Sequence, residues 1–240
     1  MWYFINHLIS PKKFLRLATI SSPWLLSFFV LSLGYGLIAG FLLAPSDYLQ
    51  GDAYRIIYLH VPAAFLSLTI YVIMAVAAFC GLIWQLNMAY LVMRESAVIG
   101  AAFTLLALVT GSLWGKPMWG TWWIWDARLT SELLLLFLYL GFLLLQSALK
   151  GRSQANKVLA LIVLVGCLDI PIIHYSVYWW NTLHQGASIR LFAESSIDTR
   201  MLYPLFSMVL AFFIYYGYIL FLRLRIRLLA MRERAIRDAR

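Results

Sequence analysis

The sequence predicts an all-α integral membrane protein, a bundle of six transmembrane helices with both termini in the cytoplasm. Hydrophobic residues make up 63% of the 240-residue chain and charged residues only 12%, more apolar surface than a water-soluble domain of this length can bury. Six apolar segments approach the roughly 20 residues with which a helix crosses a hydrocarbon core. Basic residues gather between alternate segments. We therefore treat residues 1–240 as a single membrane domain.

The six predicted spans cover residues 24–44, 60–84, 97–114, 129–149, 158–180 and 202–222. Each is expected to be helical, because a strand outside a closed barrel leaves its backbone groups unpaired in lipid. The first span contains Gly34, Gly36 and Gly40, which are typical of closely packed membrane helices. Its apolar stretch is too long for a signal peptide, so we expect it to be retained as a span.

The distribution of Lys and Arg predicts the orientation of the spans. Fourteen of the 19 lie on one side: Lys12, Lys13, Arg16, Arg94, Lys150, Arg152, Lys157 and seven arginines from Arg223 to Arg240. The positive-inside rule places this side in the cytoplasm. Loops 45–59, 115–128 and 181–201 then face outward. We expect the basic C-terminal tail to contact anionic lipid headgroups, and we expect no nucleic-acid partner.

Tryptophan is concentrated in one predicted outward loop. Five of the ten tryptophans lie there: Trp114, Trp119, Trp122, Trp123 and Trp125. An aromatic belt at the membrane interface is one interpretation, although a belt spreads over both faces. Gly115, Pro117 and Gly120 are interleaved with these tryptophans and are expected to hold a defined non-helical loop. Such a flat, apolar surface would suit a large planar ligand.

Two histidines, His60 and His184, map to the same outward face as the tryptophans. A histidine at a membrane interface is often only a polar side chain at a wet boundary. Two that converge beside an aromatic surface form the arrangement that six-coordinate haem iron requires, with one imidazole on each side of the ring.

His174 lies inside the fifth span, after Asp169 and Pro171. An ionisable residue at that depth is a functional candidate. We expect His174 to be a packed side chain, bonded to a carbonyl that Pro171 has freed or to Asp169, and to lie at most near the ligand. His7 is expected to be a solvated side chain.

Haem carries two propionates, which favour cations at the wet edge of a site. Arg55, Lys116, Arg128 and Arg190 are the outward candidates, and arginine is the better shaped for a carboxylate. Asp126 stands where the fourth span begins. We expect it to cap that helix and to complement its dipole, and pairing with Arg128 is a further possibility.

Several activities are excluded by spacing. Cys80 and Cys167 are isolated, so no C-x-x-C motif exists for thiol redox chemistry or for covalent c-type haem attachment. The segment from Gly111 to Pro117 has the wrong spacing for a phosphate-binding loop and ends in proline instead of Ser or Thr. We therefore predict no ATPase activity and no catalytic residue.

Longer motifs carry a family resemblance. W-G-T-W-W-I-W-D-A-R-L-T-S-E-L, from Trp119 to Leu133, resembles the "WWD" signature of membrane proteins that handle haem. Three further motifs resemble the haem exporter protein C (CcmC) family of cytochrome c maturation. They are Y-R-I-I-Y-L-H-V-P-A-A from Tyr54, G-K-P-M-W-G from Gly115, and P-I-I-H-Y-S-V-Y-W-W-N-T-L-H-Q-G from Pro171. The resemblance covers the chain apart from its terminal tails.

The resemblance implies that His60 and His184 are axial ligands of a non-covalently bound haem b. It implies that Trp114 to Asp126 forms the haem platform. Arg55 and Arg128 are the cations that we expect to bind the haem beside it, from the argument on the propionates. It further implies delivery of haem, in a lyase-like transfer, to a periplasmic haem chaperone (the E component) at the bacterial inner membrane. The implied partners are the A and B components of an ABC transporter and a small single-span D component. A haem permease and a b-type electron-transfer cytochrome are the alternatives, but the spans hold few polar residues and the two histidines lie at the rim.

Overall fold

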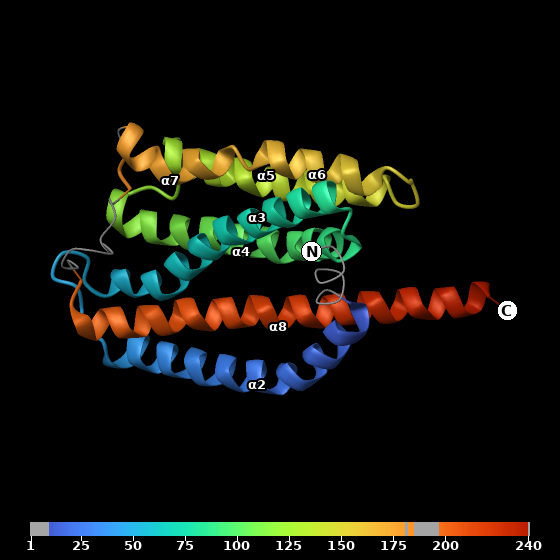
Figure 1. Ribbon diagram of the computed structural model, residues 1–240. Helices are drawn as coiled ribbons and strands as arrows, with labels where there is room; N and C mark the ends of the chain where they lie inside the picture. Colours follow the sequence, from blue (N-terminus) through green and yellow to red (C-terminus); the bar gives the residue numbers. More distant parts are fainter. Residues whose placement is uncertain (1–9, 181, 185–196, 240) are drawn as a thin grey trace.

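The computed structural model describes residues 10–180, 182–184 and 197–239. Six helices within these residues are long and apolar enough to cross a membrane, and the described residues form no strand, which confirms the predicted all-α six-span fold (Figure 1). The elements are α2 (Pro11–Leu37), the π-helix η1 (Ile38–Leu43), the 3₁₀-helix η2 (Asp52–Ile56), α3 (Ile57–Trp84), α4 (Asn87–Trp119), α5 (Ala127–Ala148), α6 (Ala155–Gly166), α7 (Asp169–Trp179) and α8 (Thr199–Asp238). Helix α2 with η1 forms the first span, and α6 with α7 forms the fifth.

The bundle has two distinct ends (Figure 1). At one end lie residues 44–51, 120–126, 180 and 182–184, which we call the aromatic end. At the other lie residues 85–86 and 149–154, the first turn of α2 and the last turns of α8, which we call the basic end. Both ends of the described chain are therefore on the same side of the bundle. The assignment of that side to the cytoplasm stays a prediction.

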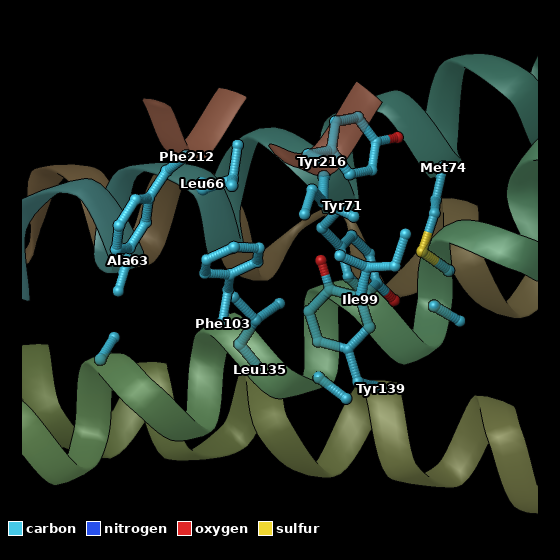
Figure 2. Close-up of a cluster of buried hydrophobic side chains, with 14 of the residues drawn as sticks. Ala63, Leu66, Tyr71, Met74, Ile99, Phe103, Leu135, Tyr139, Phe212 and Tyr216 are labelled. Carbon is cyan, nitrogen blue, oxygen red and sulfur yellow. The ribbon is translucent and has the colours of Figure 1, made fainter. Parts of the chain in front are cut away.

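Side chains from α3, α4, α5 and α8 meet in the core of the bundle (Figure 2). The rings of Tyr71 and Tyr139 lie edge to face, with their centres 5.1 Å apart. Gly100 leaves room for the Tyr139 ring, and the Tyr139 hydroxyl donates to the backbone oxygen of Ser67 at 2.8 Å. Apolar burial drives no association between helices in lipid, so such close approaches and interhelical hydrogen bonds hold the spans together.

The helices at the aromatic end are longer than predicted. Helix α3 begins at Ile57, directly after η2, so much of the expected loop 45–59 is helical. Helix α4 continues to Trp119, and the prediction that Gly115 and Pro117 hold a non-helical loop is wrong. A proline in the last turn removes only one helical hydrogen bond. A Cβ atom at Gly115 would lie 2.9 Å from Cε3 of Trp119, so glycine lets that ring fold back on its own helix.

Helix α4 ends at Gly120, which takes a left-handed conformation with φ of 76°. Its N–H donates to the backbone oxygen of Lys116 at 3.1 Å, a common helix-terminating arrangement. The irregular part of the tryptophan-rich segment is therefore confined to residues 120–126.

The fifth span is not continuous, because Cys167 and Leu168 separate α6 from α7. Pro171 falls in the first turn of α7, where its missing N–H would have had no helical partner. The expectation that Pro171 frees a carbonyl deep in the span is therefore not met. Asp169, the first residue of α7, is only 5% exposed.

Candidate functional site

The structure brings His60 and His184 together at the aromatic end. Their ring centres are 6.3 Å apart and the rings are tilted by 35°. A metal ion bonded to one nitrogen of each imidazole, with bonds of about 2 Å, would separate the ring centres by roughly 6 Å. The described residues contain no group of three or more His, Cys, Asp or Glu side chains placed to hold a metal. The spacing of the pair thus fits one metal ion between two imidazoles.

Helix α4 orients the His60 ring. His60 Nδ1 lies 3.0 Å from the backbone oxygen of Ala107 and 3.1 Å from Oγ1 of Thr110. A carbonyl oxygen only accepts, so this contact places the hydrogen on Nδ1 and leaves the Nε2 lone pair available to a metal. A Cβ atom at Gly111 would lie 3.0 Å from His60 Cε1, so glycine admits the ring. Ala107, Thr110, Gly111 and Trp114 share one face of α4, at helical spacing.

Two tryptophans pack beside the histidine pair. The Trp114 ring lies edge-on to His60, with centres 5.7 Å apart, and its Nε1 donates to Gln50 Oε1 at 2.9 Å. The Trp119 ring lies 6.2 Å from His184, at an angle of 58°. Gln50 was not predicted from the sequence. Trp114 and Trp119 therefore enclose the histidine pair from α4.

The other three tryptophans extend the surface outward. Trp123 and Trp125 lie edge to face, 5.5 Å apart, and Trp125 is 76% exposed. Trp122 is also exposed, and the Lys116 ammonium lies 5.7 Å from its ring centre. Trp123 Nε1 is buried and has no hydrogen-bond partner among the described residues. A buried donor of this kind is available to an acceptor on a bound ligand.

Asp126 caps α5 as predicted, because its carboxylate accepts from Leu129 N–H at 2.8 Å. The same carboxylate accepts from the Thr182 hydroxyl, and Thr182 Oγ1 accepts from His184 N–H at 3.1 Å. The helix cap thereby fixes the segment that carries His184. Asp126 and Arg128 do not form a direct ion pair in the described residues, so the further possibility of pairing is not met. Thr182 was missed, although a threonine two residues before a functional residue is a typical side-chain turn.

Arg55 is held within the protein. Its Nη1 donates to the backbone oxygen of Gly40 at 2.8 Å and its Nη2 to that of Ala44 at 3.0 Å. Its Nε pairs with Asp52 at 3.1 Å. These bonds satisfy carbonyls at the end of the first span, which helices leave without partners. A contact of Arg55 with haem stays a prediction.

The other predicted cations have protein partners as well. Lys116 Nζ donates to the backbone oxygen of Gly120 at 3.1 Å. Arg128 Nη1 donates to that of Ile173 at 3.1 Å, which ties α5 to α7. Arg128 is close enough to His60 to act on it electrostatically. Arg190 lies outside the described residues.

The expectation for His174 is wrong. His174 is exposed on α7 and its ring contacts Tyr175, with centres 4.8 Å apart. Asp169 is buried, and neither of its carboxylate oxygens has a hydrogen-bond partner among the described residues. Asp169 and His174 are five residues apart on α7, so their side chains point about 140° away from each other around the helix axis and face different surroundings. His7 lies outside the described residues.

Glu132 is a buried acid that the sequence reasoning missed. It is 8% exposed, and the Ser67 hydroxyl donates to its Oε1 at 2.7 Å. It is the one acidic residue inside the predicted fourth span, and an ionisable residue in a span is the signal that could have found it.

Comparison with known proteins identifies the family. The family described as "CcmC: Heme exporter protein C" matches residues 4–239. Heme exporter protein C of Escherichia coli strain K12 is 51% identical over 234 residues, 98% of this chain and 94% of that protein. The chain belongs to the CcmC family.

Two further relatives are similar over three quarters or more of this chain. Heme exporter protein C of Haemophilus influenzae is 45% identical over 95% of this chain and 93% of that protein. A Marchantia polymorpha protein named "Putative cytochrome c biosynthesis ccmC-like mitochondrial protein" is 48% identical over 76% of this chain and 77% of that protein. The predicted resemblance to CcmC proteins is thus confirmed, and the family match also reaches into the terminal tails.

Proposed function

We propose that this CcmC-family protein binds haem at the aromatic end and presents it to a periplasmic haem chaperone during cytochrome c maturation. The single observation that carries the proposal is the 6.3 Å spacing of the His60 and His184 rings. The names of the relatives, "Heme exporter protein C" and a cytochrome c biosynthesis protein, support haem as the cargo. The haem would be a non-covalently bound haem b, and the site would face the periplasm from the bacterial inner membrane.

Each part of the site has a task in this proposal. His60 and His184 hold the iron from two sides, with Nε2 of His60 kept free for it by the bond from Nδ1 to Ala107. Trp114 and Trp119 cover the histidines and exclude water. The exposed Trp122 and Trp125 offer an apolar rim to the incoming chaperone. The protein contributes binding and orientation, and the covalent attachment forms on a histidine of the chaperone.

The partners in this proposal are the haem chaperone (E component), the ABC transporter components A and B, the small single-span D component and membrane lipid. Membership of the CcmC family supports them, because the name Heme exporter protein C describes one part of an export system.

Two other functions fit less well. A haem permease would need a polar route through the spans, and buried Glu132 and Asp169 are the observation in its favour. The core between the spans is, however, filled by side chains such as Tyr71, Tyr139 and Leu135, each at most 1% exposed. A b-type cytochrome would place its histidines near mid-membrane, whereas His60 lies in the first turn of α3.

The test is co-expression with the candidate chaperone, followed by detection of covalent haem on the chaperone. We expect loading with the unaltered protein and none with the double variant His60→Ala, His184→Ala. His174→Ala is the matched control, because it removes an exposed histidine. Equal loading by all three proteins would refute the proposal.

A further inference from the structure

The basic end contains a cavity with a volume of about 300 Å³. It lies between the first two turns of α4, the start of α6 and residues 227–234 of α8. Its lining combines three arginines with Asn87, Asn156 and apolar side chains such as Leu91 and Met231. This mixture of charged and apolar groups is typical of the region where a membrane helix meets the lipid headgroups.

The charge of the lining is positive. Arg94, Arg227 and Arg234 line the cavity, and none of the acidic side chains that the structure describes does. Glu95 lies nearby, but its short ion pair, at 2.9 Å, is with Arg223, and its contact with Arg227 is 4.0 Å long. The arginines of the cavity are therefore only weakly neutralised.

One of the polar side chains is held in place for a ligand. Arg94 Nη1 donates to Asn156 Oδ1 at 3.1 Å, which fixes one guanidinium across the gap between α4 and α6. Tyr90 also lines the cavity, and its ring packs against Gly81 with the hydroxyl buried.

We propose that this cavity binds a phosphate group, supplied by an anionic phospholipid of the surrounding membrane. Guanidinium groups form paired, charge-assisted hydrogen bonds with phosphate oxygens, and three arginines line this cavity. Basic pockets between spans at the cytoplasmic side are typical sites for anionic headgroups. Leu91 and Met231 would contact the glycerol and upper acyl carbons. Soluble phosphate has the same chemistry and is the alternative source. This site is separate from the histidine pair and does not depend on haem binding.

The test is native mass spectrometry of the full-length protein, purified in detergent and titrated with phosphatidylglycerol. The variant Arg94→Gln, Arg227→Gln removes two cavity charges. The matched control Arg232→Gln, Arg237→Gln removes two charges from the same tail, at exposed positions outside the lining. We expect about tenfold weaker retention of phosphatidylglycerol in the cavity variant, because two charge-assisted bonds are lost. The control should retain it as the unaltered protein does.

Two further arms complete the experiment. Retention of zwitterionic phosphatidylcholine should be the same in the unaltered protein and in both double variants. Inorganic phosphate at millimolar concentration distinguishes the two sources of the phosphate group. If the lipid stays bound, the natural occupant is a lipid headgroup. If the lipid is displaced, soluble phosphate binds in the same site. Equal retention in the cavity variant and its control would overturn the proposal. The proposal would also be overturned if the cavity variant retained the lipid but lost a co-purifying protein.

Discussion

The two ends of the bundle use their cations differently. At the aromatic end Arg55, Lys116 and Arg128 all donate to backbone oxygens, so each holds a chain segment in place. At the basic end Arg94, Arg227 and Arg234 line a cavity that has no acidic side chain in its lining within the described part of the chain.

This difference shows that a count of basic residues predicts orientation but not role. At the aromatic end, rings and imidazoles form the proposed haem site, and the cations hold backbone segments in place. At the basic end, arginines line the proposed phosphate site. Each of the following predictions tests one side of this comparison.

The largest effect is expected from reporter fusions that assign the two ends to compartments. Fusions at residues 155 and 240 should be active only in the cytoplasm, and fusions at 50, 120 and 190 only in the periplasm, because 14 of the 19 basic residues favour one side. Activity should be all or none for each reporter. A C-terminal fusion that is active only in the periplasm would show that this assignment of the two ends to compartments is wrong.

Next comes the iron site. The purified protein should carry haem with a low-spin, six-coordinate absorption spectrum. Changing His60 or His184 alone to Ala should open one coordination position and give a high-spin spectrum, which added imidazole partly restores. Haem retention should fall more than about tenfold in the double variant.

The control for the iron site is His174→Ala, which should leave the spectrum unchanged because His174 is exposed and lies on α7 outside the pair. A low-spin spectrum that survives the double change but collapses in His174→Ala would show that the ligands are wrong.

The tryptophans should act together as a surface. Changing Trp119, Trp122, Trp123 and Trp125 to Ala should abolish loading of the chaperone while membrane insertion persists. A single change of Trp122 or Trp123 to Phe should weaken haem retention only about twofold to tenfold, because most of the ring area survives. Both are measured by covalent haem on the chaperone and by haem in the purified protein. Normal loading by the fourfold variant would show that these tryptophans form only an aromatic belt at the membrane interface.

A smaller effect is expected at Thr182, which links Asp126 to the backbone of His184. Thr182→Val keeps the shape but loses the hydroxyl, and outer partners of metal ligands commonly contribute about tenfold to affinity. We expect about tenfold weaker haem retention and a spectrum more sensitive to imidazole. Thr182→Ser should restore both, and a Val variant indistinguishable from Ser would exclude the positioning role.

The smallest effect on haem is expected at Arg55, since its guanidinium is bonded to Asp52, Gly40 and Ala44. Arg55→Gln should lower the free energy of unfolding by about 1–3 kcal/mol, because carbonyls lose charged donors. The haem spectrum should stay low-spin. Thermal unfolding followed by circular dichroism measures the first effect. A large loss of haem with unchanged stability would instead favour a propionate contact.

Sequence patterns predicted the number of spans and the convergence of His60 with His184. Span number follows from apolar length, which is a local property of the chain. The convergence of His60 with His184 was predicted because both histidines were assigned to the outward face of the membrane. The sequence could not predict how they are held, because the Ala107 carbonyl and the Gly111 gap become visible only when α3 and α4 are packed together.

Element boundaries were predicted less well, for two physical reasons. Gly115 and Pro117 normally interrupt helices, yet here glycine admits the Trp119 ring and proline falls in the last turn. Apolar length alone also hid the break after Gly166, because α6 and α7 together match one span. Asp169 follows that break directly, but from the sequence we interpreted Asp169 only as a possible hydrogen-bond partner of His174.

One face of α4 carries Ala107, Thr110, Gly111 and Trp114, four residues that contact or admit the His60 ring or pack beside it. The site is therefore set by the rotational phase of a single helix. Insertion of one residue just before Ala107 would turn this face by about 100° relative to the preceding part of α4 and move it away from α3. An insertion in residues 121–124, beyond the end of the helix, would leave the phase unchanged. The tolerance of this protein to insertions should therefore change sharply at Gly120, where the helix ends.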